Sequence, residues 1–159
     1  MKIYNYAKFP EGFDYNYGDI CDFDTWDLER LKDFDEVYYW YATGSYEGSG
    51  HLIGLLKGKW YMHDCGHCSC YGPTEHLDVS ENFAYDSLEE LERACSKGLI
   101  PQVRPLIDMA KEKADKEPYA KRMEREIREA YGWIRENNHT ISDEVLDLMK
   151  NAAIEKVKS

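Results

Sequence analysis

The pattern of apolar and polar positions predicts a small antiparallel sheet near the centre of the chain. Residues Val37 to Thr43 are nearly all aromatic or β-branched, which is typical of a buried strand. A second strand is expected from His51 to Leu56, after a glycine-rich loop over residues 44–50. Lys57-Gly58 then makes a two-residue turn into a third strand from Lys59 to His63. Together these strands predict an antiparallel meander.

Shorter elements are expected on both sides of this meander. Near the N-terminus we expect one short strand around Lys2 to Tyr6, and a helix that Asp24 or Thr25 caps and that ends near Phe34. After the meander, Ser87 and Glu90 have the spacing of a capping box, which predicts a helix over residues 88–97. Gly98 is the expected glycine just beyond the end of this helix.

The remainder of the chain has apolar residues at helical spacing. Pro101 and Pro105 predict the start of a helix that runs to about Lys116, and Pro118 predicts a new helix to about Asn137. Thr140 or Ser142 caps a last helix. The apolar residues expected to face inward on this last helix are Ile141, Val145, Leu148, Ala152 and Val157.

These elements predict an α+β fold, in which a small antiparallel β-meander packs against helices and the C-terminal third is all helical. The length of 159 residues is that of one ordinary domain. We therefore expect a single domain over residues 1–159, with an acidic β-rich half (1–98) that contains one helix and a helical half (99–159).

The net charge of −11 is unevenly distributed along the chain. Residues 1–50 have a net charge of −7, residues 51–100 of −4 and residues 101–159 of zero. Binding to nucleic-acid phosphates requires a basic face, which the N-terminal two thirds cannot provide. We therefore expect no direct nucleic-acid binding, and any charged partner should be basic.

Apolar runs and the positions of the cysteines indicate the cellular location of the protein. The chain has no run of eighteen apolar residues, and its N-terminal residues lack the apolar segment of a signal peptide. Three of the five cysteines lie close together at positions 65, 68 and 70, which is a poor framework for disulfides that join distant segments. We expect no membrane association and a cytoplasmic location, with thiols that are reduced or bound to metal.

Residues 11–36 combine ten carboxylates with six aromatic side chains. One interpretation is a solvated surface whose aromatic rings turn into the core. The other is a surface that imitates nucleic-acid phosphates, with aromatic rings at the centre of an interface for a basic groove. The residues expected to contact such a partner are Asp14, Asp19, Asp22, Asp24, Trp26 and Asp27.

The cysteine loop is a candidate metal site. Cys65 and Cys68 have the C-x-x-C spacing of zinc ligands, and Cys70, His63 or His76 would complete a tetrahedron. The metal-ligand prediction is Cys65, Cys68, Cys70 and His63. A second, distant ligand pair typical of zinc motifs is missing, so we expect no cofactor, with zinc as the alternative.

The same loop allows thiol chemistry. One of its cysteines would act as a nucleophile with His63, His67 or His76 as base. The Cys-Gly-His-Cys string at residues 65–68 resembles the active site of protein disulfide isomerases in the thioredoxin family, which implies a redox dithiol. Gly72-Pro73 stands where that family continues with a helix. Our main interpretation is that the cysteines are small buried residues that close a tight turn, and we assign no catalytic residue.

The string from Tyr46 to Pro73, above all Gly-His-Cys-Ser-Cys-Tyr-Gly-Pro, resembles small uncharacterised proteins of bacteriophages and their bacterial hosts. The resemblance covers about a fifth of the chain and implies a phage-encoded or prophage-encoded accessory protein, a class in which inhibitors of host defence are frequent. Its location would then be the host cytoplasm.

Acidity and this resemblance together favour a non-enzymatic interaction protein, such as a phage-encoded inhibitor. Its partner would be a host protein that acts in defence or handles nucleic acid and that presents a basic surface. The alternative is a metal-binding or thiol-dependent enzyme that uses the Cys65–Cys70 loop. The oligomeric state is not predicted by the sequence.

Overall fold

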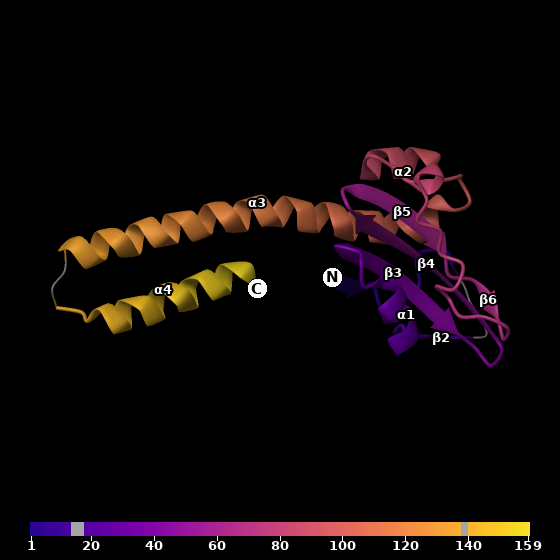
Figure 1. Cartoon of the computed structure of the whole chain (residues 1–159), viewed down its shortest axis with the longest axis horizontal. Helices are drawn as coiled ribbons and strands as arrows, with labels where there is room; N and C mark the ends of the chain where they lie inside the picture. Colours follow the sequence, from indigo (N-terminus) through magenta and orange to yellow (C-terminus); the bar gives the residue numbers. More distant parts are fainter. Residues whose placement is uncertain (14–17, 138–139) are drawn as a thin grey trace. The chain divides into compact units, whose positions relative to one another are not determined.

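The computed structural model describes residues 1–13, 18–137 and 140–159. The fold is α+β, as expected. The strands are β1 (Lys2–Asn5), β2 (Asp19–Ile20), β3 (Glu36–Thr43), β4 (Glu47–Leu56), β5 (Lys59–Asp64) and β6 (His67–Cys68). The helices are α1 (Thr25–Leu31), α2 (Leu88–Ala94), α3 (Ile100–Asn137) and α4 (Asp143–Lys158), with a 3-10 turn at Glu81–Phe83 (Figure 1).

One mixed sheet organises the first part of the chain. Its main strand order is β1-β3-β4-β5, and β3, β4 and β5 form the predicted antiparallel meander. Lys57 and Gly58 both have positive φ (50° and 78°), as a two-residue hairpin turn of this kind requires. The sheet is not purely antiparallel, because β1 pairs in parallel with β3. Residues 6–35 between the two strands are long enough for the crossover that a parallel pair needs.

Strand β3 is buried on both faces, which explains its nearly continuous run of large side chains. Val37, Tyr39 and Tyr41 belong to a core cluster that also contains Phe23, Leu31 and Phe34 from α1 and its flanks. Tyr38 and Trp40 point to the other face, where they belong to a second cluster with residues of α2 and the first turns of α3. Alternation along a single strand therefore supplies aromatic residues to both cores.

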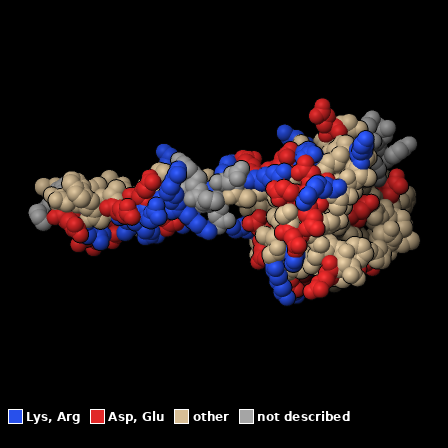
Figure 2. All heavy atoms as spheres, turned by 90° about the horizontal axis from the view of Figure 1, so that it is seen from above, with Lys and Arg blue, Asp and Glu red and all other residues tan. Residues whose placement is uncertain are grey.

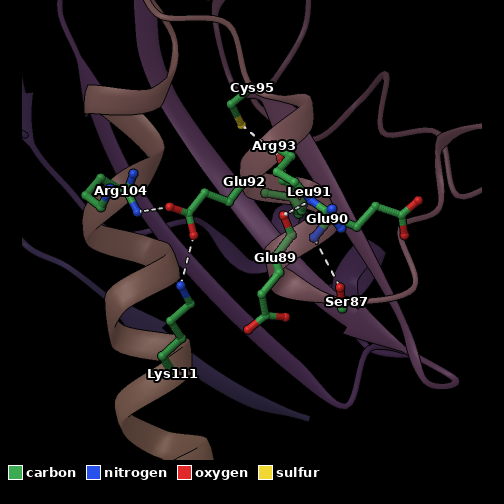
Figure 3. Close-up of polar contacts among 9 residues, drawn as sticks. All are labelled: Ser87, Glu89, Glu90, Leu91, Glu92, Arg93, Cys95, Arg104 and Lys111. Carbon is green, nitrogen blue, oxygen red and sulfur yellow. Dashed lines mark hydrogen bonds and ion pairs between the residues drawn. The ribbon is translucent and has the colours of Figure 1, made fainter.

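Helices α1 and α2 begin where the capping patterns predict. Asp24 caps α1, and Ser87 caps α2 by accepting a hydrogen bond from the Glu90 N–H. The reciprocal bond to the Glu90 carboxylate is donated by the Asp86 N–H (2.6 Å), one position before the expected donor. Figure 3 shows how Glu92 of α2 lies between Arg104 and Lys111 of α3 and accepts from both, which ties α2 to the start of α3.

Two turn predictions were wrong. The glycine-rich stretch over residues 44–50 is not all loop, because β4 already begins at Glu47. Helix α2 ends at Ala94, and Gly98 lies beyond its end without the positive φ of a helix-terminating glycine. The glycines of β4 serve close packing, as described below, and not a left-handed turn.

The chain forms two compact units, Met1–Lys111 and Glu112–Ser159. The expected single domain, with its division at residues 98 and 99, stays a prediction. Helix α3 contributes its first twelve residues to the first unit. We predicted two helices here, but α3 continues through position 118. A proline removes one backbone donor, and the good helix formers around it outweigh that loss. Within the described residues, no helix is long and apolar enough to cross a membrane.

The second unit is a helical hairpin of the later part of α3 and α4. Ion pairs from Arg135 to Asp143 and Asp147, and from Lys158 to Glu124, join the two helices. Ser142 caps α4, as expected. The prediction of its inward face was wrong for Val145, Leu148 and Ala152, which are exposed, whereas Leu146 and Ile154 are buried. Of the other predicted residues, Ile141 and Val157 are half-buried. Helix α4 has apolar residues on two faces, and only the contact with α3 determines which of them is buried.

Candidate functional site

The cysteine loop forms one corner of the sheet. The short strand β6 pairs with the start of β4, which places Cys68 opposite Glu47 and His67 opposite Gly48. Cys68 and Cys70 are exposed, and Cys65 is fully buried in the first core cluster. The interpretation of all three cysteines as buried turn residues is therefore correct only for Cys65.

A tyrosine and a histidine hold this corner in place. The Nδ1 atom of His67 lies 2.9 Å from the Cys68 carbonyl oxygen, so Nδ1 carries the proton and donates it. Its other ring nitrogen, Nε2, then accepts a hydrogen bond from the Tyr41 hydroxyl. Burial raises the pKa of Tyr41 to about 12, which keeps this hydroxyl protonated as a donor.

Gly48 makes the contact between these two side chains possible. A Cβ atom at position 48 would overlap the His67 ring and crowd the Tyr41 hydroxyl. Gly50, two residues further along β4, has a similar role. A Cβ atom there would overlap the Trp40 carbonyl oxygen of the neighbouring strand β3. The glycines that we assigned to a loop thus allow close packing at the site.

The two exposed thiols interact with each other. The N–H and the thiol of Cys70 donate hydrogen bonds to the Cys68 sulfur, which lowers the pKa of Cys68 below its ordinary value. The pKa of Cys70 is raised by the same hydrogen bond and by the charge on Cys68. By contrast, burial raises the pKa of Cys65, and also that of Cys21 and Cys95. Cys68 is therefore the thiol best suited to react as a thiolate.

The structure does not gather the predicted zinc ligands. Cys65 points into the core, Cys68 and Cys70 face solvent, and His63 Nε2 donates to the Pro73 carbonyl oxygen at 2.9 Å. His76 packs its ring against Tyr71. Among the described residues, no three His, Cys, Asp or Glu side chains are placed to hold a metal ion. A zinc site stays a prediction.

The acidic candidate surface lies at the start of α1. Asp22 and Asp24 are exposed, and Trp26 in the first turn of the helix is 77% exposed. Asp19, also exposed, lies on β2 a few residues earlier. Asp14 lies outside the described residues. We refer to Asp19, Asp22, Asp24 and Trp26 as the acidic surface.

Asp27 does not belong to this surface, although the sequence placed it there. It is buried, exchanges capping bonds with Asp24, and accepts a hydrogen bond from the Thr74 hydroxyl at 2.6 Å. Burial raises the pKa of its carboxyl. These contacts fix α1 against the segment after the cysteine loop, and they give the acidic surface a rigid base. Sequence reasoning missed Thr74, which lies 47 positions from Asp27.

Comparison with known proteins gives no similarity from which a function can be transferred: no family model matches the chain, and no similar curated protein or solved structure was found.

Proposed function

We propose that this protein is a non-enzymatic interaction protein that binds a basic surface of a partner protein through its acidic surface. The observation that carries the proposal is the exposure of Trp26, a large aromatic side chain at 77%, between carboxylates on a helix start that Asp27 and Thr74 hold rigid. Tryptophan, together with tyrosine and arginine, is enriched among the side chains that dominate protein–protein binding energy.

The charge of the first unit supports this proposal. Residues 1–111 contain twenty acidic and ten basic residues, whereas residues 112–159 contain eleven and ten, so the excess negative charge lies almost entirely in the first unit. Such a field attracts a basic partner and repels nucleic acid. The partner in this proposal is a protein whose basic groove otherwise holds nucleic-acid phosphates.

The resemblance of the Tyr46–Pro73 string to phage proteins makes a host protein the proposed partner, met in the host cytoplasm. Inhibition of a defence protein or of a nucleic-acid-handling protein would follow if the acidic surface occupies its phosphate groove. The proposal involves no direct contact with nucleic acid or membrane.

Capture of partners from host lysate at increasing salt tests the electrostatic part of the proposal. We expect proteins that are retained at low salt and released at moderate salt, because exposed charges are screened within about 10 Å at 0.1 M. Asp19→Lys should weaken capture, and Glu81→Lys, an equal charge change at an exposed position of the 3-10 turn, should not. Capture of no protein at low salt, or an equal effect of both variants, would contradict the proposal.

A second candidate function is thiol–disulfide exchange at Cys68 and Cys70, which is favoured by the lowered pKa of exposed Cys68 beside a second exposed thiol. The Cys68 thiolate would attack a small-molecule disulfide, form a mixed disulfide and release one thiolate. The Cys70 thiolate would then attack the Cys68 sulfur and release the second. The protein dithiol is oxidised to a disulfide, and the small molecule is reduced to two thiols.

Reaction with an aromatic disulfide reagent distinguishes exchange between Cys68 and Cys70 from independent modification of two exposed thiols. The wild-type protein should release two thiols per chain in a fast phase, lose the mass of two hydrogen atoms and keep no adduct. Cys70→Ser should release one thiol quickly and retain one adduct, and Cys95→Ser should behave as wild type. The absence of a fast phase, or a stable adduct on the wild-type protein, would rule the exchange out.

A further inference from the structure

Helix α4 carries an apolar stripe that none of the described residues of its own unit covers. Val145, Leu148 and Met149 are 46%, 70% and 48% exposed, and Ala152 is exposed as well. Their positions follow the i, i+3, i+4, i+7 spacing that places side chains on one helix face. The buried residues Leu146 and Ile154 lie on the opposite face, toward α3. We call the four exposed residues the α4 stripe.

The hairpin itself gives a reason for the stripe to be covered. Within residues 112–159, only Leu146 and Ile154 are buried among the side chains that the structure describes. A pair of helices with so small a core is marginal in water, because most helical stability in proteins comes from packing of an apolar face. A row of adjacent exposed Val, Leu and Met side chains is also the usual sign of an interaction site.

The charge of the hairpin favours a second copy of itself as the occupant. Its eleven acidic and ten basic residues nearly cancel, so two hairpins do not repel each other as two copies of the first unit would. Figure 2 shows Lys and Arg interspersed with Asp and Glu along this part of the chain. A strongly acidic or basic partner would not be attracted electrostatically, because the hairpin has almost no net charge.

The order of charges along α4 selects an antiparallel arrangement. Its first turn is acidic, with Asp143 and Glu144, and its last turn is basic, with Lys156 and Lys158. Lys156 lies four residues after Ala152 and therefore on the stripe face. If two α4 helices cross antiparallel at Leu148 and Met149, Lys156 of each copy comes within about one helical turn of Glu144 of the other.

We propose that the protein forms a two-fold symmetric homodimer in which the α4 stripes of two copies pack antiparallel against each other. A two-fold axis brings the same surface of both copies together, so one self-complementary stripe is sufficient. Glu144 and Lys156 flank the apolar contact and set its direction. This dimer is independent of the partner binding proposed above, which uses the first unit.

Sedimentation equilibrium of the full chain tests the dimer. Over about 1–200 µM, which spans micromolar dissociation constants, we expect the mass to rise from 18.7 kDa to a plateau at twice that value. Leu148→Glu should raise the dissociation constant at least tenfold. Because Leu148 is exposed in the single chain, circular dichroism at the lowest concentration, where the wild type is also monomeric, should show the same helix content for this variant and the wild type. Ala114→Glu, at an exposed position of α3 outside the stripe, should change the constant less than twofold.

Charge reversal tests the orientation. Glu144→Lys should weaken the dimer, and addition of Lys156→Glu in the same chain should restore it, because both pairs across the two-fold axis are then re-formed. The proposal is overturned by a monomer at every concentration, by a mass that rises without a plateau, or by a dimer that Leu148→Glu leaves unchanged. A double variant no better than Glu144→Lys would overturn the antiparallel arrangement.

Discussion

His51 is a buried titratable side chain that links the sheet to α3. Its Nε2–H donates to the Gln102 side-chain oxygen at 2.8 Å, and the Trp40 indole donates to the Gln102 carbonyl oxygen at 2.8 Å. Burial lowers the pKa of His51, although the hydrogen bond to Gln102 and the charge of Asp64 act in the opposite direction. His51 is therefore neutral in the folded protein under conditions where the unfolded chain binds a proton.

This difference makes stability depend on pH in a definite direction. Because the pKa of His51 is lower in the folded protein than in the unfolded chain, where it is about 6.5, the stabilising contribution is fully present above pH 6.5. It is lost as the pH falls towards the folded-state pKa. Between pH 7.5 and 5.5 the wild type should lose up to about 1.4 kcal/mol of unfolding free energy through His51. His51→Gln, which keeps the donor to Gln102, should show a shallower pH dependence in urea unfolding. Equal slopes would contradict the neutral state of His51.

Roles that depend on neighbouring residues were predicted correctly from the sequence, but contacts between residues far apart in the chain were not. Asp24 was correctly predicted as a helix cap because capping depends on residues three positions apart. Its neighbour Asp27 was assigned to the surface, since nothing in the sequence indicates that Thr74 would reach it. The lowered pKa of Cys68 likewise comes from its hydrogen bonds with Cys70, which the spacing of the two cysteines in the sequence did not indicate.

At the scale of elements, the β3–β4 pair depends on the absence of a side chain at position 50. Gly50→Ala should destabilise the protein by at least about 2 kcal/mol, because the obstructing atoms belong to the backbone of β3 and cannot rotate away. Gly98→Ala should change stability by less than about 0.5 kcal/mol, since open space surrounds that position and its backbone needs no glycine. Denaturant unfolding of both variants measures the difference, and similar losses for the two would refute the packing role of Gly50.

Elements with local signals were predicted correctly, and elements decided by tertiary contacts were not. The Lys57-Gly58 hairpin and the helix starts at Asp24, Ser87 and Ser142 follow from neighbouring residues. The start of β4 and the buried face of α4 depend on which segment packs against them. The parallel pairing of β1 with β3 could not be predicted from the sequence either, because four residues do not indicate which strand they will pair with.

At the scale of the whole molecule, both hydrophobic clusters lie within residues 1–111. We therefore expect a fragment of residues 1–111 to fold alone, with a melting temperature within about 5 °C of the full chain for its own transition. A fragment of residues 112–159 should be mostly unfolded at low concentration, because it buries few side chains. Near-ultraviolet circular dichroism of the two fragments tests this division, and an unfolded 1–111 fragment would show that the units depend on each other.

The central claim is that the acidic surface binds a partner through Trp26, and the matched pair Trp26→Ala and Trp133→Ala tests it most directly. Both tryptophans are largely exposed, at 77% and 66%, so neither change should disturb folding, and only the first lies on the acidic surface. In capture from host lysate at low salt, we expect Trp26→Ala to lose the proteins that the wild type retains and Trp133→Ala to keep them. Retention of the same proteins by Trp26→Ala, or their loss only with Trp133→Ala, would contradict the account.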